Sequence, residues 1–131
     1  MKITVPYFGD LSCNNYKVVR NGRATITTKP EVKVWMAKLA YKVEYRQKIE
    51  PVDLSGEIII GLWGHFRDRR IPDLSNLHKV TLDAISVGLG INDKFFRCLD
   101  LGVSTGSIEP TLDIYITEKV ANLPNSLGRL N

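Results

Sequence analysis

The stretch GEIIIGLWGHF, residues 56–66, reads as a largely buried β-strand. Its first positions are apolar on both faces of an extended chain, a pattern typical of strands that are covered on both sides. Helical patterns precede and follow this strand. Apolar residues recur at spacings of three and four from residue 31 to about residue 48, with Pro30 at a natural helix start. A second helix is predicted from about residue 75 to residue 88 or 90.

Shorter strands are predicted on either side of this central part. ITV at 3–5 ends at Pro6, and the pair Asn21-Gly22 suits a tight hairpin turn. RCLDLGVS at 97–104 and PTLDIYITEK at 110–119 alternate in polarity like two strands. We expect the intervening STGSIE to join these two strands as a hairpin.

The order strand, hairpin, helix, strand, helix, strand, strand predicts an α+β fold. Such a chain forms a single small domain, with a mixed β-sheet and two helices packed on one face. We expect this domain to span residues 1–120. Residues 121–131 have turn residues and little periodicity, so they are expected to form a tail that is frayed or draped over a partner.

Length and composition are those of a small globular protein. The 131 residues suffice for one domain with its own core. No apolar run approaches the ~20 residues needed to cross a bilayer, and no signal peptide is evident at the start. Cys13 and Cys98 form no disulfide framework, so we expect a cytoplasmic protein with reduced thiols. The net charge of +4, from 18 basic and 14 acidic residues, mildly favours an anionic partner.

A polar stripe is predicted along the second helix. At 3.6 residues per turn, Asn76, Lys79 and Asp83 share one face. An ordinary solvated helix accounts for these residues with Ser75 as N-cap, Asp73 at the positive end of the helix dipole, and Lys79 paired with Asp83.

A functional site is the alternative explanation of the stripe. If the glycine-rich stretch after the helix doubled the chain back, Asp73 and Asp93 would converge on a geometry suited to Mg²⁺. Lys79 would point to the same place as a fixed positive charge. An arginine cluster leads into the segment and comprises Arg67, Arg69 and Arg70. Carboxylates, a lysine and a basic approach together indicate phosphodiester chemistry.

At this point the sequence resembles the RusA family of Holliday-junction resolvases. The family's central pattern, D-x-D-N-x-x-K-x-x-x-D-A followed after a short gap by two acids, stands here as DLSNLHKVTLDA at 73–84 and ND at 92–93. The family opens with a strand ending at proline, a stretch containing serine and asparagine, a basic hairpin and a helix. Their counterparts are ITVP, SCNNY at 12–16, RNGRATIT at 20–27 and the helix that follows. The resemblance extends from about residue 3 to about residue 118.

The resemblance implies a metal-dependent endodeoxyribonuclease that acts as a homodimer in DNA recombination and repair. Each subunit would nick one of two opposed strands of a four-way DNA junction, with Mg²⁺ as cofactor and Mn²⁺ as a plausible substitute. Carried over by position, the catalytic residues are Asp73, Lys79 and Asp93. Asp73 and Asp93 would also bind the metal. Asn76 and Asp83 are further motif members, and Asp83 either binds the metal or orients Lys79, with the latter favoured.

Two positions depart from the family pattern, because Ser75 and Asn92 stand where the family has acids. A hydroxyl or an amide oxygen can coordinate a hard cation, but attracts it less than a carboxylate does. The alternative function is therefore a branched-DNA-binding protein of the same fold with weakened or no cleavage. Side chains expected to contact DNA are those of Asn15, Tyr16, Arg23, Arg67, Arg69 and Arg70.

Zinc binding is not indicated by the spacing of the candidate ligands. Among His65, His78, Cys13 and Cys98, no pair has the separation typical of zinc sites. Adjacent helical positions point about 100° apart, so His78 is expected to turn away from the stripe that contains Lys79.

Overall fold

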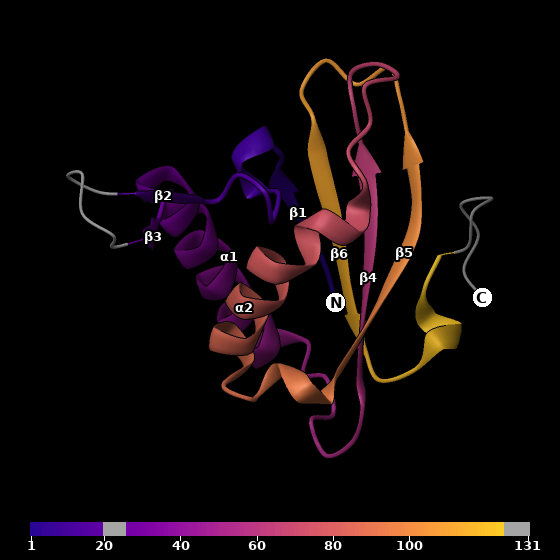
Figure 1. Ribbon diagram of the computed structural model, residues 1–131. Coiled ribbons are helices and arrows are strands. Elements are labelled where there is room, and N and C mark those ends of the chain that lie inside the picture. The colour runs from indigo at the N-terminus through magenta and orange to yellow at the C-terminus, as the bar shows by residue number, and fades with distance from the viewer. Residues whose placement is uncertain (20–25, 125–131) are drawn as a thin grey trace.

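Strands and helices follow one another in the predicted order in the computed structural model, which describes residues 1–19 and 26–124 (Figure 1). The strands and helices are β1 (Lys2–Pro6), β2 (Lys17–Val19), β3 (Ile26–Thr28), α1 (Pro30–Ile49), β4 (Ile58–His65), α2 (His78–Leu89), β5 (Phe96–Ser104) and β6 (Thr111–Thr117). Short 3₁₀ turns are η1 (Gly9–Leu11), η2 (Leu74–Leu77), η3 (Asp93–Phe95) and η4 (Val120–Asn122). The predicted turn at Asn21-Gly22 lies outside the described residues, between β2 and β3.

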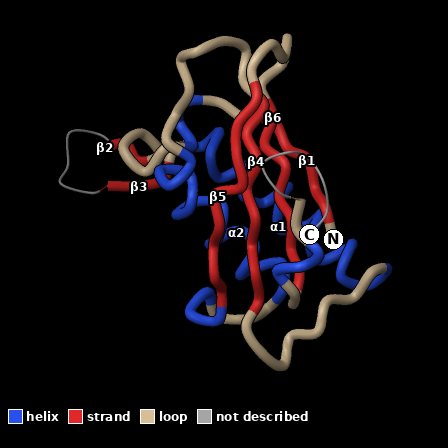
Figure 2. The backbone as a smooth tube through the Cα atoms, turned by 90° about the vertical axis from the view of Figure 1, so that its right-hand side faces the viewer, coloured by secondary structure: helices blue, strands red, loops and turns tan. Residues whose placement is uncertain are grey.

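The main sheet has four strands in the order β1-β6-β4-β5, and β2 and β3 form a separate antiparallel pair (Figure 2). β6 is antiparallel to both of its neighbours, whereas β4 and β5 are parallel. The predicted hairpin between β5 and β6 is therefore wrong, because β4 lies between them. β4 takes this central place since Ile58, Ile59 and Ile60 are all buried and need cover on both faces.

Both helices pack on one face of the sheet, as predicted, and the core lies between the two layers (Figure 1). The apolar residues of α1 that recur at spacings of three and four form its buried face. They are Val32, Trp35, Leu39, Ala40 and Val43. α2 crosses α1 closely at Gly88, where an added Cβ would come within 2.6 Å of the Ala40 carbonyl oxygen. Glycine is required at this position because no side chain fits between the helices.

The helix that carries the polar stripe starts differently from the prediction. Its first turn is the 3₁₀ turn η2, and the N-cap is Asp73, whose carboxylate accepts a hydrogen bond from the Ser75 amide at 3.0 Å. Ser75 is therefore not the N-cap. α2 ends as expected at Gly90, which has φ = 71°, a left-handed conformation that glycine adopts without strain.

The second face of the sheet is partly covered by the segment after β6. Leu123 is 1 % exposed, and its Cδ2 lies 3.1 Å from the place where Gly61 would carry a Cβ. The first residues of the predicted tail thus pack on the chain's own sheet, and residues 125–131 are outside the described range. Neither described helix has the length and apolar character to cross a membrane.

Candidate functional site

Lys79 and Asp83 share one face of α2, as their spacing in the polar stripe predicts, and Asn76 lies before them in η2. Val80, Ala84 and Ile85 are buried against the core, and the opposite side is open to solvent. There, the Lys79 ammonium lies 3.2 Å from the Asp83 carboxylate. Asp83 raises the pKa of Lys79, first through this hydrogen bond and then through its charge, so the lysine stays protonated at neutral pH.

Asp73 gives this face a negative charge at the helix start. Hydrogen bonds from Ser75 are the main cause of the lowered pKa of Asp73, and the nearby charge of His78 lowers it further. The carboxylate is therefore ionised at neutral pH while it caps the turn. An ionised carboxylate at a helix N-terminus also interacts favourably with the helix dipole.

The segment SCNNY packs directly against the start of this helix. The Cys13 amide donates to the Asn76 carbonyl oxygen at 2.7 Å, and its thiol donates to Asn76 Oδ1 at 3.6 Å. Tyr16 lies close enough to Lys79 to contribute to its raised pKa. Asn15 is exposed and donates to the Gly9 carbonyl oxygen at 3.4 Å. The structure thus brings together two motif regions that lie 63 residues apart in sequence.

The predicted DNA-contacting arginines have different surroundings. Arg70 pairs with Asp68 at 2.9 Å, and this hydrogen bond is the main cause of the low Asp68 pKa of about 2. Arg67 donates to the Ile108 carbonyl oxygen at 3.2 Å. The Arg69 side chain makes no ion pair or hydrogen bond with any residue in 1–19 or 26–124. Arg23 lies outside the described residues.

Asp73 and Asp93, which are expected to converge, lie on either side of α2 in the chain. Asp73 precedes the 12-residue helix, which is about 18 Å long, and Asp93 follows it in η3. The chain continues from η3 directly into β5 (Figure 1). Asn92 is also engaged, because its side chain accepts a hydrogen bond from the Lys94 amide at 2.9 Å.

Asp93 lies near enough to Lys79 for its charge to contribute to the raised pKa of that lysine. Within the described ranges, Asp73, Asp83 and Asp93 do not bring oxygen atoms within 4.8 Å of one another as a group of three. Asp83 is already paired with Lys79, which neutralises its charge. The role expected for Asp83, that of orienting Lys79, is the one that this contact favours.

A different cluster of possible ligands lies beside the start of α2. The His78 imidazole turns away from the stripe, as predicted, and its Nε2 lies 2.7 Å from Asp100 Oδ1 on β5. The Cys98 thiol completes a group whose ligand atoms all lie within 4.8 Å of one another. Burial, followed by the charge of Asp100, raises the pKa of Cys98 to about 12. Sequence spacing could not reveal this group, since it depends on how α2 packs against β5.

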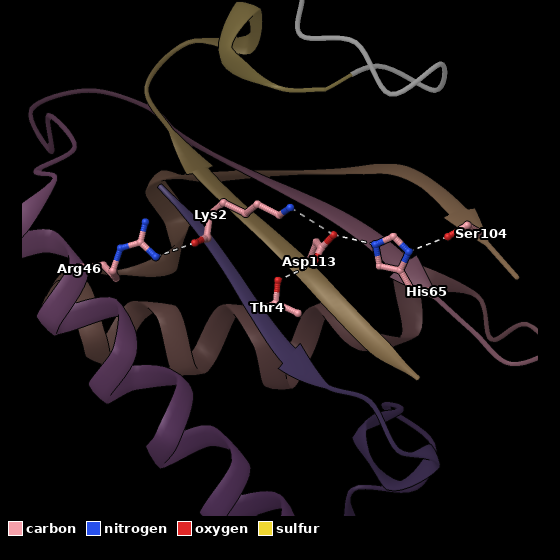
Figure 3. Close-up of polar contacts among 6 residues, drawn as sticks. All are labelled: Lys2, Thr4, Arg46, His65, Ser104 and Asp113. Atoms are coloured by element: carbon pink, nitrogen blue, oxygen red, sulfur yellow. Dashed lines mark hydrogen bonds and ion pairs between the residues drawn. The ribbon is translucent and has the colours of Figure 1, made fainter. Parts of the chain in front are cut away.

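A second polar cluster lies on the opposite face of the sheet (Figure 3). His65 is held between Ser104, 2.6 Å from Nδ1, and Asp113, 2.7 Å from Nε2. Asp113 also accepts a hydrogen bond from Thr4 at 2.7 Å and lies 3.8 Å from the Lys2 ammonium. These contacts link all four strands of the sheet.

Serine, histidine and aspartate also form the catalytic triad of serine hydrolases, but the arrangement here differs. In such triads the serine faces Nε2 and the aspartate faces Nδ1. Around His65 the two positions are exchanged, and Asp113 is shared with Thr4 and Lys2. The cluster therefore differs from such a triad, and its contacts form a network that links the strands.

A bulge in β5 explains why the two clusters face opposite ways. Asp100 pairs with Leu62, but the next residue of β4, Trp63, pairs with Gly102. The extra residue reverses the alternation of side chains along β5. The even-numbered residues before the bulge, such as Asp100, point towards α2, whereas the even-numbered Ser104 after it points to the other face.

No protein-family model and no curated protein matches the chain.

Proposed function

We propose that this chain is a metal-dependent endodeoxyribonuclease that recognises four-way DNA junctions and nicks two opposed strands as a homodimer. The contact between Cys13 and Asn76 carries the proposal, because it joins the two regions that resemble the RusA family into one surface. This surface presents Lys79 and Asp73 to solvent on one side of the helix, while the other side forms the core.

The charges on this surface suit a phosphodiester substrate. Lys79 carries a positive charge that Asp83 holds in place, and a fixed cation stabilises the negative charge that develops on a phosphate during cleavage. The Arg69 side chain has no ion-pair or hydrogen-bond partner in the described part of the chain, so it can contact DNA backbone phosphates. Such contacts position a protein on DNA without reading the base sequence. The requirement for a metal comes from the family resemblance.

Cleavage and binding of a synthetic four-way junction test the proposal. We expect preferred binding to the junction over a linear duplex of the same strands, and paired symmetric nicks when Mg²⁺ or Mn²⁺ is added. A chelator should abolish the nicks but leave binding intact. Equal affinity for the junction and the duplex, or no binding to either, would contradict the proposal.

Junction binding without cleavage is the second candidate function, and the positions of the acids favour it. Asp73 and Asp93 lie at opposite ends of α2 in one chain, and Asn92 is used as the cap of η3. The variant Ser75→Asp restores the family's acid in the first helical turn, where a negative charge is compatible with the helix dipole. A large gain of cleavage would show a weakened nuclease, whereas tight binding without nicks in either protein would support the second candidate.

A further inference from the structure

We propose that His78, Cys98 and Asp100 form a binding site for a transition-metal ion of the zinc class. Their nitrogen, sulfur and oxygen donors all lie within 4.8 Å of one another. The site differs from the magnesium site that the family resemblance implies, in both its residues and its donor atoms. It does not depend on the proposed nuclease activity.

The fold places the three side chains together through the crossover from β4 to β5. α2 connects these two parallel strands, so its first residue, His78, lies over the middle of β5. Cys98 and Asp100 are alternate residues of β5 before its bulge, and both therefore point towards α2. The ligands thus come from a helix and a strand that are packed against each other rather than from a loop.

The three ligand atoms lie near enough to one another to share one metal ion. Ligand atoms at zinc–nitrogen, zinc–oxygen and zinc–sulfur bond lengths lie about 3.3–3.7 Å apart around a tetrahedral centre. His78 Nε2 and Asp100 Oδ1 are 2.7 Å apart, at hydrogen-bond distance. A small outward movement of these two side chains replaces their hydrogen bond with two metal bonds. Cys98 then supplies the third bond from the buried side of the site.

The donor set indicates which metals bind. Imidazole and thiolate ligands favour Zn²⁺ and similar ions, whereas Mg²⁺ prefers an all-oxygen shell. Binding is not a redox step: the Cys98 thiol releases its proton to solvent as its sulfur bonds to the metal. Three protein ligands leave a fourth position, and the side chains of His78 and Asp100 are 28 % and 38 % exposed. The fourth position therefore faces solvent and can hold water.

The carboxylate of Asp73 increases the attraction of a cation to the site formed by His78, Cys98 and Asp100. The charge of His78 is among the causes that lower the pKa of Asp73, so this ionised carboxylate lies near the imidazole. Together with Asp100, it puts two negative charges beside the imidazole. A metal bound there would lie next to the polar stripe of α2.

Titration of the full-length, chelator-treated protein with Co²⁺ and then Zn²⁺ tests the site without DNA. The chain has two cysteines and two histidines, so Cys13→Ala and His65→Gln are matched controls for Cys98→Ala and His78→Gln. We expect one Co²⁺ per chain, with a thiolate-to-cobalt charge-transfer band in wild type and in Cys13→Ala. Cys98→Ala should lose the band, and His78→Gln should lower affinity by more than roughly 100-fold, the upper end of what losing an outer partner of a metal ligand costs.

Thermal unfolding provides a second readout that also checks folding. Zn²⁺ should raise the unfolding temperature of wild type and both controls, since a ligand that binds only the folded state stabilises it. It should not raise that of Cys98→Ala, whose own unfolding transition in chelator shows that it is folded. The absence of a charge-transfer band in wild type, or a band that Cys13→Ala removes and Cys98→Ala keeps, would overturn the proposal. Failure of junction cleavage would not affect it.

Discussion

The Asp73 carboxylate accepts a hydrogen bond from the Ser75 amide at 3.0 Å, so the acid that opens the polar motif also caps the helix that carries it. Removing this side chain therefore has two effects, one on the charge of the surface and one on the stability of the fold. The two effects can be separated because asparagine caps helices about as well as aspartate does.

Two substitutions at Asp73 should differ in stability. Asp73→Asn keeps an oxygen that can accept from the Ser75 amide, so its free energy of unfolding should stay close to that of wild type. Asp73→Ala loses the cap, so its free energy of unfolding should fall below that of wild type and of Asp73→Asn. Urea denaturation of the two variants measures the difference. Equal losses in both would show that the charge, rather than the hydrogen bond, stabilises the turn.

Lys79 should matter for cleavage and little for folding. Its pair with Asp83 is exposed, and such i,i+4 pairs contribute about 0.3–0.5 kcal/mol. Lys79→Met should therefore unfold at nearly the wild-type urea concentration but cleave a four-way junction at least about 100-fold more slowly, as after loss of a charge-stabilising group. Lys38→Met, at an exposed lysine of α1, is the matched control and should cleave normally. A similar loss in both variants would argue against a specific role for Lys79.

Asp113 should be more important for stability than for activity. It is 7 % exposed and has hydrogen bonds with Thr4 and His65, so Asp113→Ala leaves both partners without it. Losing buried hydrogen bonds to a charged group should cost about 1–3 kcal/mol in the free energy of unfolding. Glu57→Ala, at an exposed acid before β4, should change it by less than about 0.5 kcal/mol. A chemical denaturation series distinguishes the two, and equal small effects would contradict the structural role of the network.

Alkaline pH should destabilise the protein partly through Cys98. Its pKa is about 12 in the folded chain, against an ordinary value of 9.0. Between these values the unfolded chain releases the proton and the folded chain keeps it, so the free energy of unfolding falls as pH rises. Cys98→Ala should therefore lose less stability than wild type between pH 8 and about pH 10, and Cys13→Ala should behave as wild type. Urea midpoints measured in chelator at the two pH values test this prediction. An equal change of stability with pH in all three proteins would contradict the raised pKa of the buried thiol.

The order and type of the main elements could be predicted because they depend on local patterns. The 3.6-residue period placed Lys79 and Asp83 on one face, and the contact between them confirms this, whereas Asn76 lies in the 3₁₀ turn η2 and is half-buried. Strand order was harder, since it depends on long-range pairing. The hairpin expected between β5 and β6 followed the usual adjacency of consecutive strands. The continuous apolar run of β4 decided the strand order instead, because such a strand must lie between two others.

The candidate site could be predicted only in part from the sequence, because it too depends on long-range pairing. Linear spacing shows which residues share a helix face, but not what lies across from that face. His78 was expected to leave the stripe, yet its partner Asp100 depends on the parallel register of β5 beside β4. Asp73 and Asp93 likewise lie at opposite ends of α2, because this helix carries the chain back along the sheet before the parallel strand β5 begins.

Cleavage of a labelled four-way junction by wild type and Asp73→Asn, side by side with Mg²⁺ or Mn²⁺, tests the central claim most directly. Because the asparagine variant keeps its cap, its folding can be verified under the same conditions. We expect paired symmetric nicks with wild type, none with Asp73→Asn, and similar junction binding by both proteins. Nicks of equal yield from both proteins, or no preference of either protein for the junction over linear duplex, would contradict the account.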